Sequence, residues 1–469
     1  MLLNIILGLA QISLANSNYH FQLPEGRRIG YCERGPTNGK PVGISIGGHK
    51  INNFKTLAGH NMVRNIVAII RILLLACIIL FATVFLAISI YDSPEFGLRL
   101  LKYGQSDISD YLIFPERHIQ NGDNVSFLER GDQAIPNTIF WYDPVINEER
   151  MESLDELFEL TATNAFIVVR DDRIVYEGYF NGKTSDSIHT AFSASKSFAS
   201  ALIGAAIADD SIESIDDTVI KYVPEIAGRG LDALTIRDLL LMNSGIRYEY
   251  NSDLPFYKHP FGDDALTYYS PDLRRVALRV EADERPIGSA FHYNNYHLLL
   301  EGMILERSTG MTISEYLQEK IWKPMGAEYP ASWSLDSERS GFEKMESGMN
   351  ARAIDFARFG LIFLHDGYWN GSQIIPEEWV HESAEPLAPD IRDWDPIFQD
   401  FLSDGGYYKY HWAGYRITES VYDFWAAGHY GQYIYIAPRK DVVIVRLGDQ
   451  TDYPVEWRLT FRSIVDQMD

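Results

Sequence analysis

The spacing of apolar and polar positions changes several times along the chain, and each pattern predicts a different element. Residues 72–90 form an uncharged apolar run that is long enough to cross a bilayer as a helix. Residues 165–180 hold two β-rich runs joined at Asp171-Asp172, which predicts a hairpin, and residues 432–447 predict a second one. Residues 197–208 are small or apolar almost all round, which is typical of a helix buried in a core.

These patterns predict an α+β fold that follows one transmembrane helix. A closing helix is expected at 455–467, so that an antiparallel sheet made from both ends of the domain is flanked by helices, with a helical domain inserted at about 200–360. The expected divisions are an N-terminal extension (1–61), a transmembrane anchor (62–92), a linker and N-terminal wrap (93–160) and the main domain (161–469).

The charges around the apolar run predict its orientation. Lys50, Lys55, Arg64 and Arg71 precede the run, and Arg99 and Lys102 follow it closely. Because basic residues gather on the cytoplasmic side, we expect a single pass through the inner (cytoplasmic) membrane with the main domain on the periplasmic or extracellular side. The alternative is a cleaved signal peptide, for which Ala87-Ile88-Ser89 is a cleavage site of small residues.

The N-terminal extension carries a pattern of a different kind. Residues 23–42 resemble the opening strands of an α/β-hydrolase, and residues 43–47 (GISIG) match the Gly-x-Ser-x-Gly pattern of its nucleophile elbow. An elbow needs several strands before it and a helix after it, and neither fits before the membrane segment. We therefore interpret the match as a decoy, and residues 1–61 as a fused remnant or an over-extended gene start.

Composition excludes several classes of partner. The chain has 469 residues, 46% of them hydrophobic, which is enough for one large domain or two closely packed ones. Its formal charge of -24 argues against nucleic acid. Two cysteines, Cys32 and Cys77, provide no disulfide framework, and His292 and His297 have no evident third ligand, so that no metal or other cofactor is expected.

Three short motifs carry the candidate chemistry. They are Ser193-Ala194-Ser195-Lys196, Tyr293-Asn294-Asn295 and His429-Tyr430-Gly431. A serine hydroxyl is a poor nucleophile until a base takes its proton, and a lysine one helical turn later reaches it. A tyrosine from another loop can relay that proton, and a glycine-containing strand edge can bring backbone N–H groups to a developing oxyanion.

With these motifs the chain resembles the serine β-lactamase and penicillin-binding-protein superfamily, in the class C and esterase-like branch that includes hydrolases of 6-aminohexanoate oligomers. The similarity runs from about residue 105 to the C-terminus and includes the runs 235–246, 286–297, 319–326, 347–367 and 427–446. The resemblance implies a nucleophilic Ser193, its base Lys196 and a second acid/base Tyr293. It also implies that Asn295 hydrogen-bonds the substrate or Lys196, and that the backbone N–H groups of Ser193 and Gln432 form the oxyanion hole.

One departure from the superfamily concerns substrate choice. The lactamases proper carry Lys-Thr-Gly as the third motif, whereas His429 stands here in the lysine position. An imidazole is largely neutral near pH 7, which favours a small-molecule or short-peptide ester or amide over a β-lactam. Gly431, together with Tyr248 from the aromatic loop 247–270 and Trp412 from the acidic and aromatic loop 385–412, is expected to contact the substrate.

Three functions therefore remain open. The first is a membrane-tethered serine hydrolase that forms an acyl-enzyme on Ser193 and cleaves an ester or amide. The second is a cell-wall D-amino-acid peptidase or transpeptidase with the same chemistry. The third is a penicillin-recognising sensor without turnover, against which the joint presence of Ser193, Lys196 and Tyr293 argues. The oligomeric state is not predicted.

Overall fold

The computed structural model describes residues 55–132, 135–143, 148–386, 392–395, 401–402, 405–449 and 455–468. The expectations for residues 1–54, including the GISIG pattern, lie outside these ranges, as do parts of the loop 385–412. The chain divides into two compact units, 1–74 and 75–469, and the division falls within helix α2 (Lys55–Tyr91).

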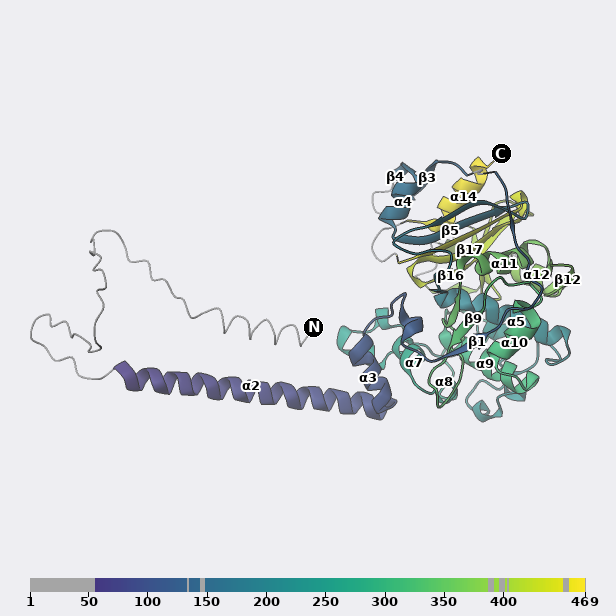
Figure 1. The fold of residues 1–469 in the computed structure, drawn as a ribbon. Coiled ribbons are helices and arrows are strands. Elements are labelled where there is room, and N and C mark those ends of the chain that lie inside the picture. The colour runs from purple at the N-terminus through teal and green to yellow at the C-terminus, as the bar shows by residue number, and fades with distance from the viewer. Residues whose placement is uncertain are drawn as a thin grey trace, which may run out of the picture. The chain divides into compact units, whose positions relative to one another are not determined.

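Helix α2 contains the apolar run (Figure 1). Within the described residues, Arg64–Tyr91 is the one helix that is long and apolar enough to cross a membrane. These properties suit a membrane anchor and also a signal sequence near the N-terminus.

Eight strands of the described chain form one sheet, in the order β14-β15-β16-β17-β18-β5-β6-β2. The strands are β14 (Gly406–Lys409), β15 (Trp412–Arg416), β16 (Tyr422–Gly428), β17 (Gln432–Ala437), β18 (Val442–Gly448), β5 (Thr163–Arg170), β6 (Arg173–Tyr179) and β2 (Glu129–Arg130). Neighbours pair antiparallel except β2 and β6, which are parallel. The hairpin at Asp171-Asp172 is confirmed, and both residues have the positive φ that a tight hairpin turn requires.

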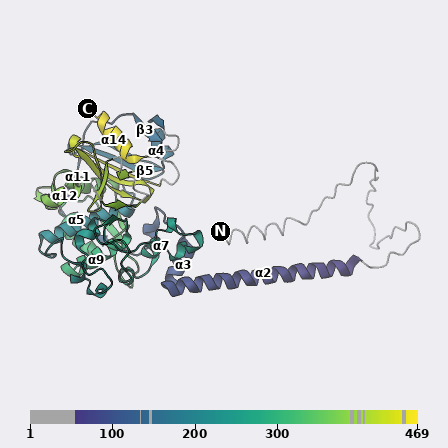
Figure 2. The same cartoon turned by 180° about the vertical axis from the view of Figure 1, so that it is seen from behind.

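The sheet is covered on both faces, because successive side chains of a strand point to opposite sides. Ile167 and Val169 of β5 join the core cluster that contains α5 (Ser195–Ala208) and α11 (Ala353–Leu364). Phe166 and Val168 join the second cluster, under α14 (Trp457–Gln467). Figures 1 and 2 show α14, in yellow, and α11 on opposite sides of the strands. The closing helix and the α+β layering are confirmed.

Helices fill the part of the chain between β6 and β14, as expected. They are α5, α6 (Ile236–Leu240), α7 (Asp263–Tyr269), α8 (Leu273–Ala277), α9 (Asn295–Thr309), α10 (Ile313–Leu317), α11 and α12 (Glu377–Ala384). Helix α5 is buried almost throughout, as its all-round apolar pattern predicts.

The sequence did not predict a smaller sheet, of which three strands lie in this part of the chain and one, β1 (Glu116–Ile119), lies before β6. It has the order β1-β9-β10-β7, formed by β1, β9 (Ala331–Ser334), β10 (Met349–Ala351) and β7 (His189–Thr190). The remaining short strands are the pairs β8 (Ala290–Phe291) with β13 (Asp393–Trp394) and β11 (Tyr368–Trp369) with β12 (Ser372–Gln373).

Residues 93–160, for which the sequence predicts a linker and wrap, contain ordered elements. Besides β1 and β2 they are α3 (Pro94–Tyr103), the hairpin of β3 (Thr138–Asp143) with β4 (Glu148–Ser153), and α4 (Leu154–Leu160). Helix α14 packs on β3, and α4 packs on β5. Residues 93–160 therefore help to cover the face of the large sheet on which α14 lies.

Candidate active site

Ser193 and Lys196 lie at the entry to the buried helix α5. Ser193 is in the 3₁₀ turn η2 (Phe192–Ala194), and Lys196 is the second residue of α5. The Nζ of Lys196 donates to Oγ of Ser193 at 3.0 Å and to the carbonyl oxygen of Glu346 at 3.0 Å. Lys196 is 1% exposed, whereas Ser193 is half-buried. The first motif thus places a shielded amine within proton-transfer distance of an accessible hydroxyl.

The segment 346–349 holds this turn in place. The Ala191 N–H donates to the carbonyl oxygen of Met349 at 2.8 Å, and the Met349 N–H donates to Oγ of Ser195 at 3.0 Å. Together with the bond from Lys196 to Glu346, these contacts fix both ends of the turn that carries Ser193.

Phe192, directly before Ser193, has a left-handed backbone conformation with φ of 46°. Such a conformation is strained for a bulky residue and is found most often at functional sites. The Phe192 ring contacts the rings of Tyr430, at 5.4 Å between centroids, and His429, at 6.0 Å. A Cβ on Gly428 would overlap the carbonyl oxygen of Ala191, so only glycine permits this approach of β16. The first and third motifs are therefore neighbours.

Tyr293 reaches the same place from the loop before α9. Its ring centroid lies 4.9 Å from Nζ of Lys196. The Asn294 side chain accepts from the Tyr296 N–H at 2.8 Å and donates to the carbonyl oxygen of Ile246, which caps the helix and fixes the loop. The Tyr250 hydroxyl lies 2.6 Å from the carbonyl oxygen of Tyr293. The structure thus brings all three motifs together.

Asn295 differs in part from its expected role. Its Nδ2 donates to the Tyr248 hydroxyl at 3.0 Å and to Oγ1 of Thr267 at 3.3 Å. Its Oδ1 is buried and has no hydrogen-bond partner among the described residues. Because Lys196 donates to Ser193 and Glu346 instead, the expected contact between Asn295 and Lys196 is not formed.

The His429 side chain is exposed, and partial loss of hydration lowers the pKa of its imidazole from the usual value. His429 is therefore neutral near pH 7. Gly431 and Gln432 follow, and the turn η2 packs on β16 and on β17, which begins at Gln432. The Gln432 side chain donates to the carbonyl oxygens of His429 and Gly448, at 3.0 and 2.7 Å.

Two of the expected substrate contacts are wrong. Trp412 is 0% exposed and packs among Phe359, Phe363 and Phe424, so it is a core residue that a substrate does not touch. Tyr248 is buried as well, and its hydroxyl donates to Oδ1 of Asp264 at 2.7 Å. Burial and the Asp264 charge raise the pKa of Tyr248 well above 10. Its position fits a support for Asn295 rather than a substrate contact.

Arg446 was missed by the sequence analysis. This fully buried guanidinium donates to the carbonyl oxygens of Tyr430 and Gly431, at 3.0 and 2.6 Å, and to the carbonyl oxygen of Thr161 at 2.6 Å. Burial lowers the pKa of Arg446 to about 9. It holds the turn of the third motif against the sheet. In the sequence, an arginine within an apolar strand was the available signal.

A buried ion pair behind Lys196 was missed too. Nζ of Lys344 donates to Oε1 of Glu346 at 2.9 Å and to the carbonyl oxygen of Tyr268 at 2.6 Å. Burial lowers the pKa of the Lys344 ammonium, and the Glu346 carboxylate opposes that shift. The pair fixes the residue whose carbonyl oxygen accepts from Lys196.

Behind Tyr293 lies a further polar cluster centred on Asp395. The carboxylate contacts Nδ1 of His292 at 2.8 Å, the Tyr250 hydroxyl at 2.9 Å and the Arg285 guanidinium at 3.2 Å. Burial alone raises the pKa of Asp395, but the hydrogen bond from His292 and its other partners bring it below the usual value. Nδ1 of His292 is thus already hydrogen-bonded to the Asp395 carboxylate. Among the described residues no group of three or more histidine, cysteine or acidic side chains is arranged to hold a metal ion.

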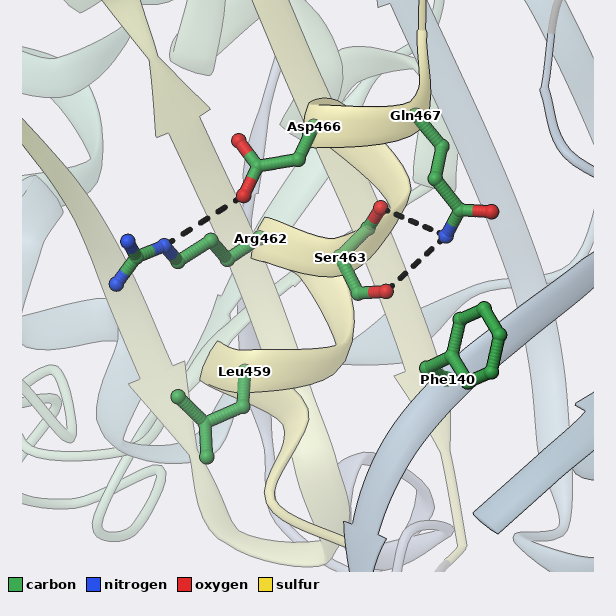
Figure 3. A pocket seen from close by; sticks show the side chains of 6 residues that line it. All are labelled: Phe140, Leu459, Arg462, Ser463, Asp466 and Gln467. Carbon is green, nitrogen blue, oxygen red and sulfur yellow. Dashed lines mark hydrogen bonds and ion pairs between the residues drawn. The ribbon is translucent and has the colours of Figure 1, made fainter. Parts of the chain in front are cut away.

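An open hollow of about 380 Å³ lies elsewhere, on the α14 face of the sheet (Figure 3). It is lined by Phe140, Leu459, Arg462, Ser463, Asp466 and Gln467. The polar lining groups bond to each other, as between Gln467 and the carbonyl oxygen of Ser463 at 2.9 Å. None of the three motifs contributes to it, so the hollow is not the catalytic site.

Comparisons with known proteins agree with this geometry. The sequence profile of the β-lactamase family matches residues 161–468. The 6-aminohexanoate-dimer hydrolase of Paenarthrobacter ureafaciens is 28% identical over 345 residues, which cover 69% of this chain and 82% of that protein. A protein of Escherichia coli K12 named for D-alanyl-D-alanine carboxypeptidase activity is 30% identical over 120 residues, 24% of this chain and 26% of that protein.

A solved structure supports the fold independently. A Bacillus anthracis protein named as a 6-aminohexanoate-dimer hydrolase superposes with a TM-score of 0.62 at 23% identity, covering 75% of this chain and 89% of that one. The family match spans most of the chain and includes all three motifs. The chain therefore belongs to the β-lactamase family and is a serine hydrolase of the amidase and esterase-like kind.

Proposed function

We propose that Ser193 attacks an ester or amide carbonyl and is acylated, with Lys196 as its base. The observation that carries this proposal is the 3.0 Å separation of Nζ and Oγ, at a lysine that is shielded from water. An amine held at this distance by Ser193 and the carbonyl oxygen of Glu346 is placed to take the proton of Oγ. Tyr293, whose ring lies against Nζ, is the second acid/base.

The steps follow from these positions. As Oγ of Ser193 bonds to the substrate carbon, its proton passes to Lys196, and the carbonyl oxygen becomes an oxyanion. The backbone N–H groups of Ser193 and Gln432 are the proposed donors to that oxyanion. Tyr293 then delivers a proton to the leaving amine or alcohol as the carbon–heteroatom bond breaks. Water attacks the acyl-enzyme in the reverse proton sequence and releases the acid and free Ser193.

The proposed substrate is a small molecule or short peptide with an ester or amide bond. Support comes from His429, which is neutral near pH 7 and does not offer a fixed cation to a carboxylate. The name of the Paenarthrobacter relative, a hydrolase of 6-aminohexanoate dimers, points to an amide. Asn295 and Gly431 are the proposed substrate contacts.

A second candidate function is a cell-wall D-amino-acid peptidase or transpeptidase. The similarity to the E. coli protein named for D-alanyl-D-alanine carboxypeptidase activity favours it. Both candidate functions proceed through an acyl-enzyme on Ser193. They differ in the acyl group that Ser193 carries and in the molecule that accepts it.

We further propose that residues 62–92 anchor the protein by a single pass through the cytoplasmic membrane, with the domain 161–469 on the periplasmic or extracellular side. The exposed apolar surface of Arg64–Tyr91 and the basic residues before it support this placement. Residues 1–61 remain a proposed extension. A phosphatase fused after Asp469 should be active, and a fluorescent protein fused there and fluorescent in the cytoplasm would contradict the topology.

The chemistry is tested on the full chain in detergent. A fluorophosphonate probe should label the wild type and fail to label Ser193→Ala, whereas Ser200→Ala is the matched control. Ser200 lies on the same helix, and its Oγ is buried without a hydrogen-bond partner among the described residues. A screen of p-nitrophenyl esters, aminohexanoate oligomers and D-Ala-D-Ala peptides separates the two candidate functions. Labelling that survives Ser193→Ala would refute the proposed nucleophile.

A further inference from the structure

The end of helix α2 is locked to the catalytic domain at Asp92. The Asp92 carboxylate is fully buried and accepts from the guanidinium groups of Arg275, at 2.7 Å, and Arg279, at 2.9 Å, and from Oγ of Ser270 at 3.0 Å. Helix α3 begins at Pro94, so no flexible spacer separates the two helices. A membrane anchor at α2 would therefore set the orientation of the domain.

Helix α3 packs beside the last turns of α2 and leaves leucines exposed. A Cβ on Gly97 would lie 3.0 Å from the Phe85 ring and 3.5 Å from the Ile88 side chain, so the two helices are in close contact there. Leu98 and Leu101 are more than half exposed. Since Phe85 and Ile88 belong to the apolar run, these leucines lie at the level of its outer end.

A second exposed apolar pair lies in the turn η6 (Phe256–Phe261). Phe256 is 83% exposed and Tyr257 73%. The turn is fixed to the end of α2, because the rings of Tyr91 and Phe261 are 5.5 Å apart and the Tyr91 hydroxyl donates to the carbonyl oxygen of Phe261 at 3.0 Å. Helix α7 packs against both α3 and η6, so the two elements are neighbours of the same helix as well as of the end of α2.

The chemistry of this surface matches a lipid headgroup layer. Each apolar pair is followed by an exposed lysine, Lys102 on α3 and Lys258 on η6, in a chain whose formal charge is -24. Leucines and aromatic rings beside lysines are typical of segments that lie in a membrane interface, with apolar groups about 5–10 Å deep and ammonium groups among the lipid phosphates. Isolated exposed apolar residues are common on proteins, but both of these pairs lie on elements that contact the C-terminal end of the apolar helix α2.

We propose that Leu98, Leu101, Lys102, Phe256, Tyr257 and Lys258, the juxta-anchor patch, insert into the headgroup layer of the bilayer and hold the catalytic domain against it in one orientation. The proposal rests on the membrane anchoring in the proposed function. It adds a second membrane contact, made by the domain itself, and makes the active site a site at the membrane surface.

The test is depth-dependent quenching on the full chain in liposomes that contain anionic lipid. The two natural cysteines, Cys32 and Cys77, are replaced by serine. Single cysteines at Leu98, Leu101 or Tyr257 are then labelled with a polarity-sensitive fluorophore, and the lipid is exchanged for lipid brominated near the headgroup. Since these side chains are exposed, the substitutions leave the core unchanged.

Two further labelled positions separate the possible failures. A label at Leu80, an exposed residue of the apolar run, reports the anchor, and a label at Tyr368, which is 53% exposed on β11, reports the domain surface outside the patch. We expect strong quenching at all patch positions and at Leu80, and several-fold weaker quenching at Tyr368. Absent quenching at Leu80 would refute the anchor. Quenching at Leu80 with patch signals equal to that of Tyr368 would refute the patch alone.

A charge variant tests whether the patch acts as a unit. Leu98→Glu combined with Leu101→Glu should expel the label at Tyr257 from the bilayer while the Leu80 label stays quenched, because a carboxylate is costly in the apolar layer. If the patch labels are instead shielded without lipid quenching, and cysteines at these positions crosslink between chains, a second copy covers the patch and the proposal is overturned.

Discussion

Replacing Lys196 by methionine should leave a folded but inactive protein. Methionine keeps most of the length of the lysine side chain but has no amine. Oγ of Ser193 and the carbonyl oxygen of Glu346 therefore lose the hydrogen bonds that Nζ donates to them. The unpaired carbonyl costs about 1–3 kcal/mol, and the removal of a buried polar amine offsets part of that cost. We therefore expect the free energy of unfolding to change by no more than about 2 kcal/mol.

The effect on activity should be much larger. Loss of a positioned base costs about 10²–10⁴ in rate, which corresponds to about 3–5 kcal/mol in the activation free energy. Because Ser193 and Lys196 act on the same proton in the proposed mechanism, the double variant Ser193→Ala with Lys196→Met should be little worse than either single variant.

The assay measures kcat/KM for a p-nitrophenyl ester with wild type, both single variants and the double variant, and urea unfolding of each. Ser200→Ala is again the control and should keep full activity. Losses that multiply in the double variant would mean that Lys196 acts independently of Ser193, and loss of the cooperative unfolding transition in Lys196→Met would mean that its role is structural. Either result would refute the base assignment.

Three more predictions concern other residues of the site and its support. Arg446→Lys should lower the free energy of unfolding by about 2–4 kcal/mol, since lysine lacks the fork that bonds the carbonyl oxygens of Tyr430 and Gly431, and denaturant titration will measure it. His429→Lys should lower KM for benzylpenicillin about fivefold, as expected for an exposed ion pair of about 1 kcal/mol, and an unchanged KM would contradict the role of His429. Burial lowers the pKa of His189 from 6.5 to about 4. The unfolded chain therefore takes up the proton first, and stability should be fully present above about pH 6.5 and fall by roughly 3 kcal/mol as the pH drops to 4. Unfolding measured across this range should lose most of that slope in His189→Leu.

The sequence predicted those parts of the fold whose pattern is local. Asp171-Asp172 between two β-rich runs predicted a hairpin, and the all-round apolar pattern of 197–208 predicted a buried helix, because turn chemistry and side-chain periodicity are properties of neighbouring residues. The short strands β7 and β10 were missed, since two or three residues show no period and pair only in the folded chain.

The candidate site divides in the same way. Ser193, Lys196, Tyr293 and His429 were found through motif spacing, and the structure brings them together. Trp412 was misread as a loop residue, whereas it begins strand β15 and its side chain points into the core. Arg446 was missed because its partners are backbone carbonyl oxygens, and Glu346 because the group that it offers to Lys196 is its own backbone carbonyl. A backbone carbonyl is the same at every residue, so the sequence does not show which one is used.

The order of the strands has a consequence for the nascent chain. The early strands β2, β6 and β5 pair with one another, but the other edge of β5 pairs with β18, which is synthesised about 270 residues later. Closing so long a loop is slow, and unpaired strand edges are prone to wrong pairing in the meantime. Until residues 429–448 have emerged, Ser193 and Lys196 lack Gln432 and the turn held by Arg446. A chain that ends before that point would carry the proposed nucleophile and base without the proposed oxyanion donor, so we expect activity to appear only once synthesis is complete.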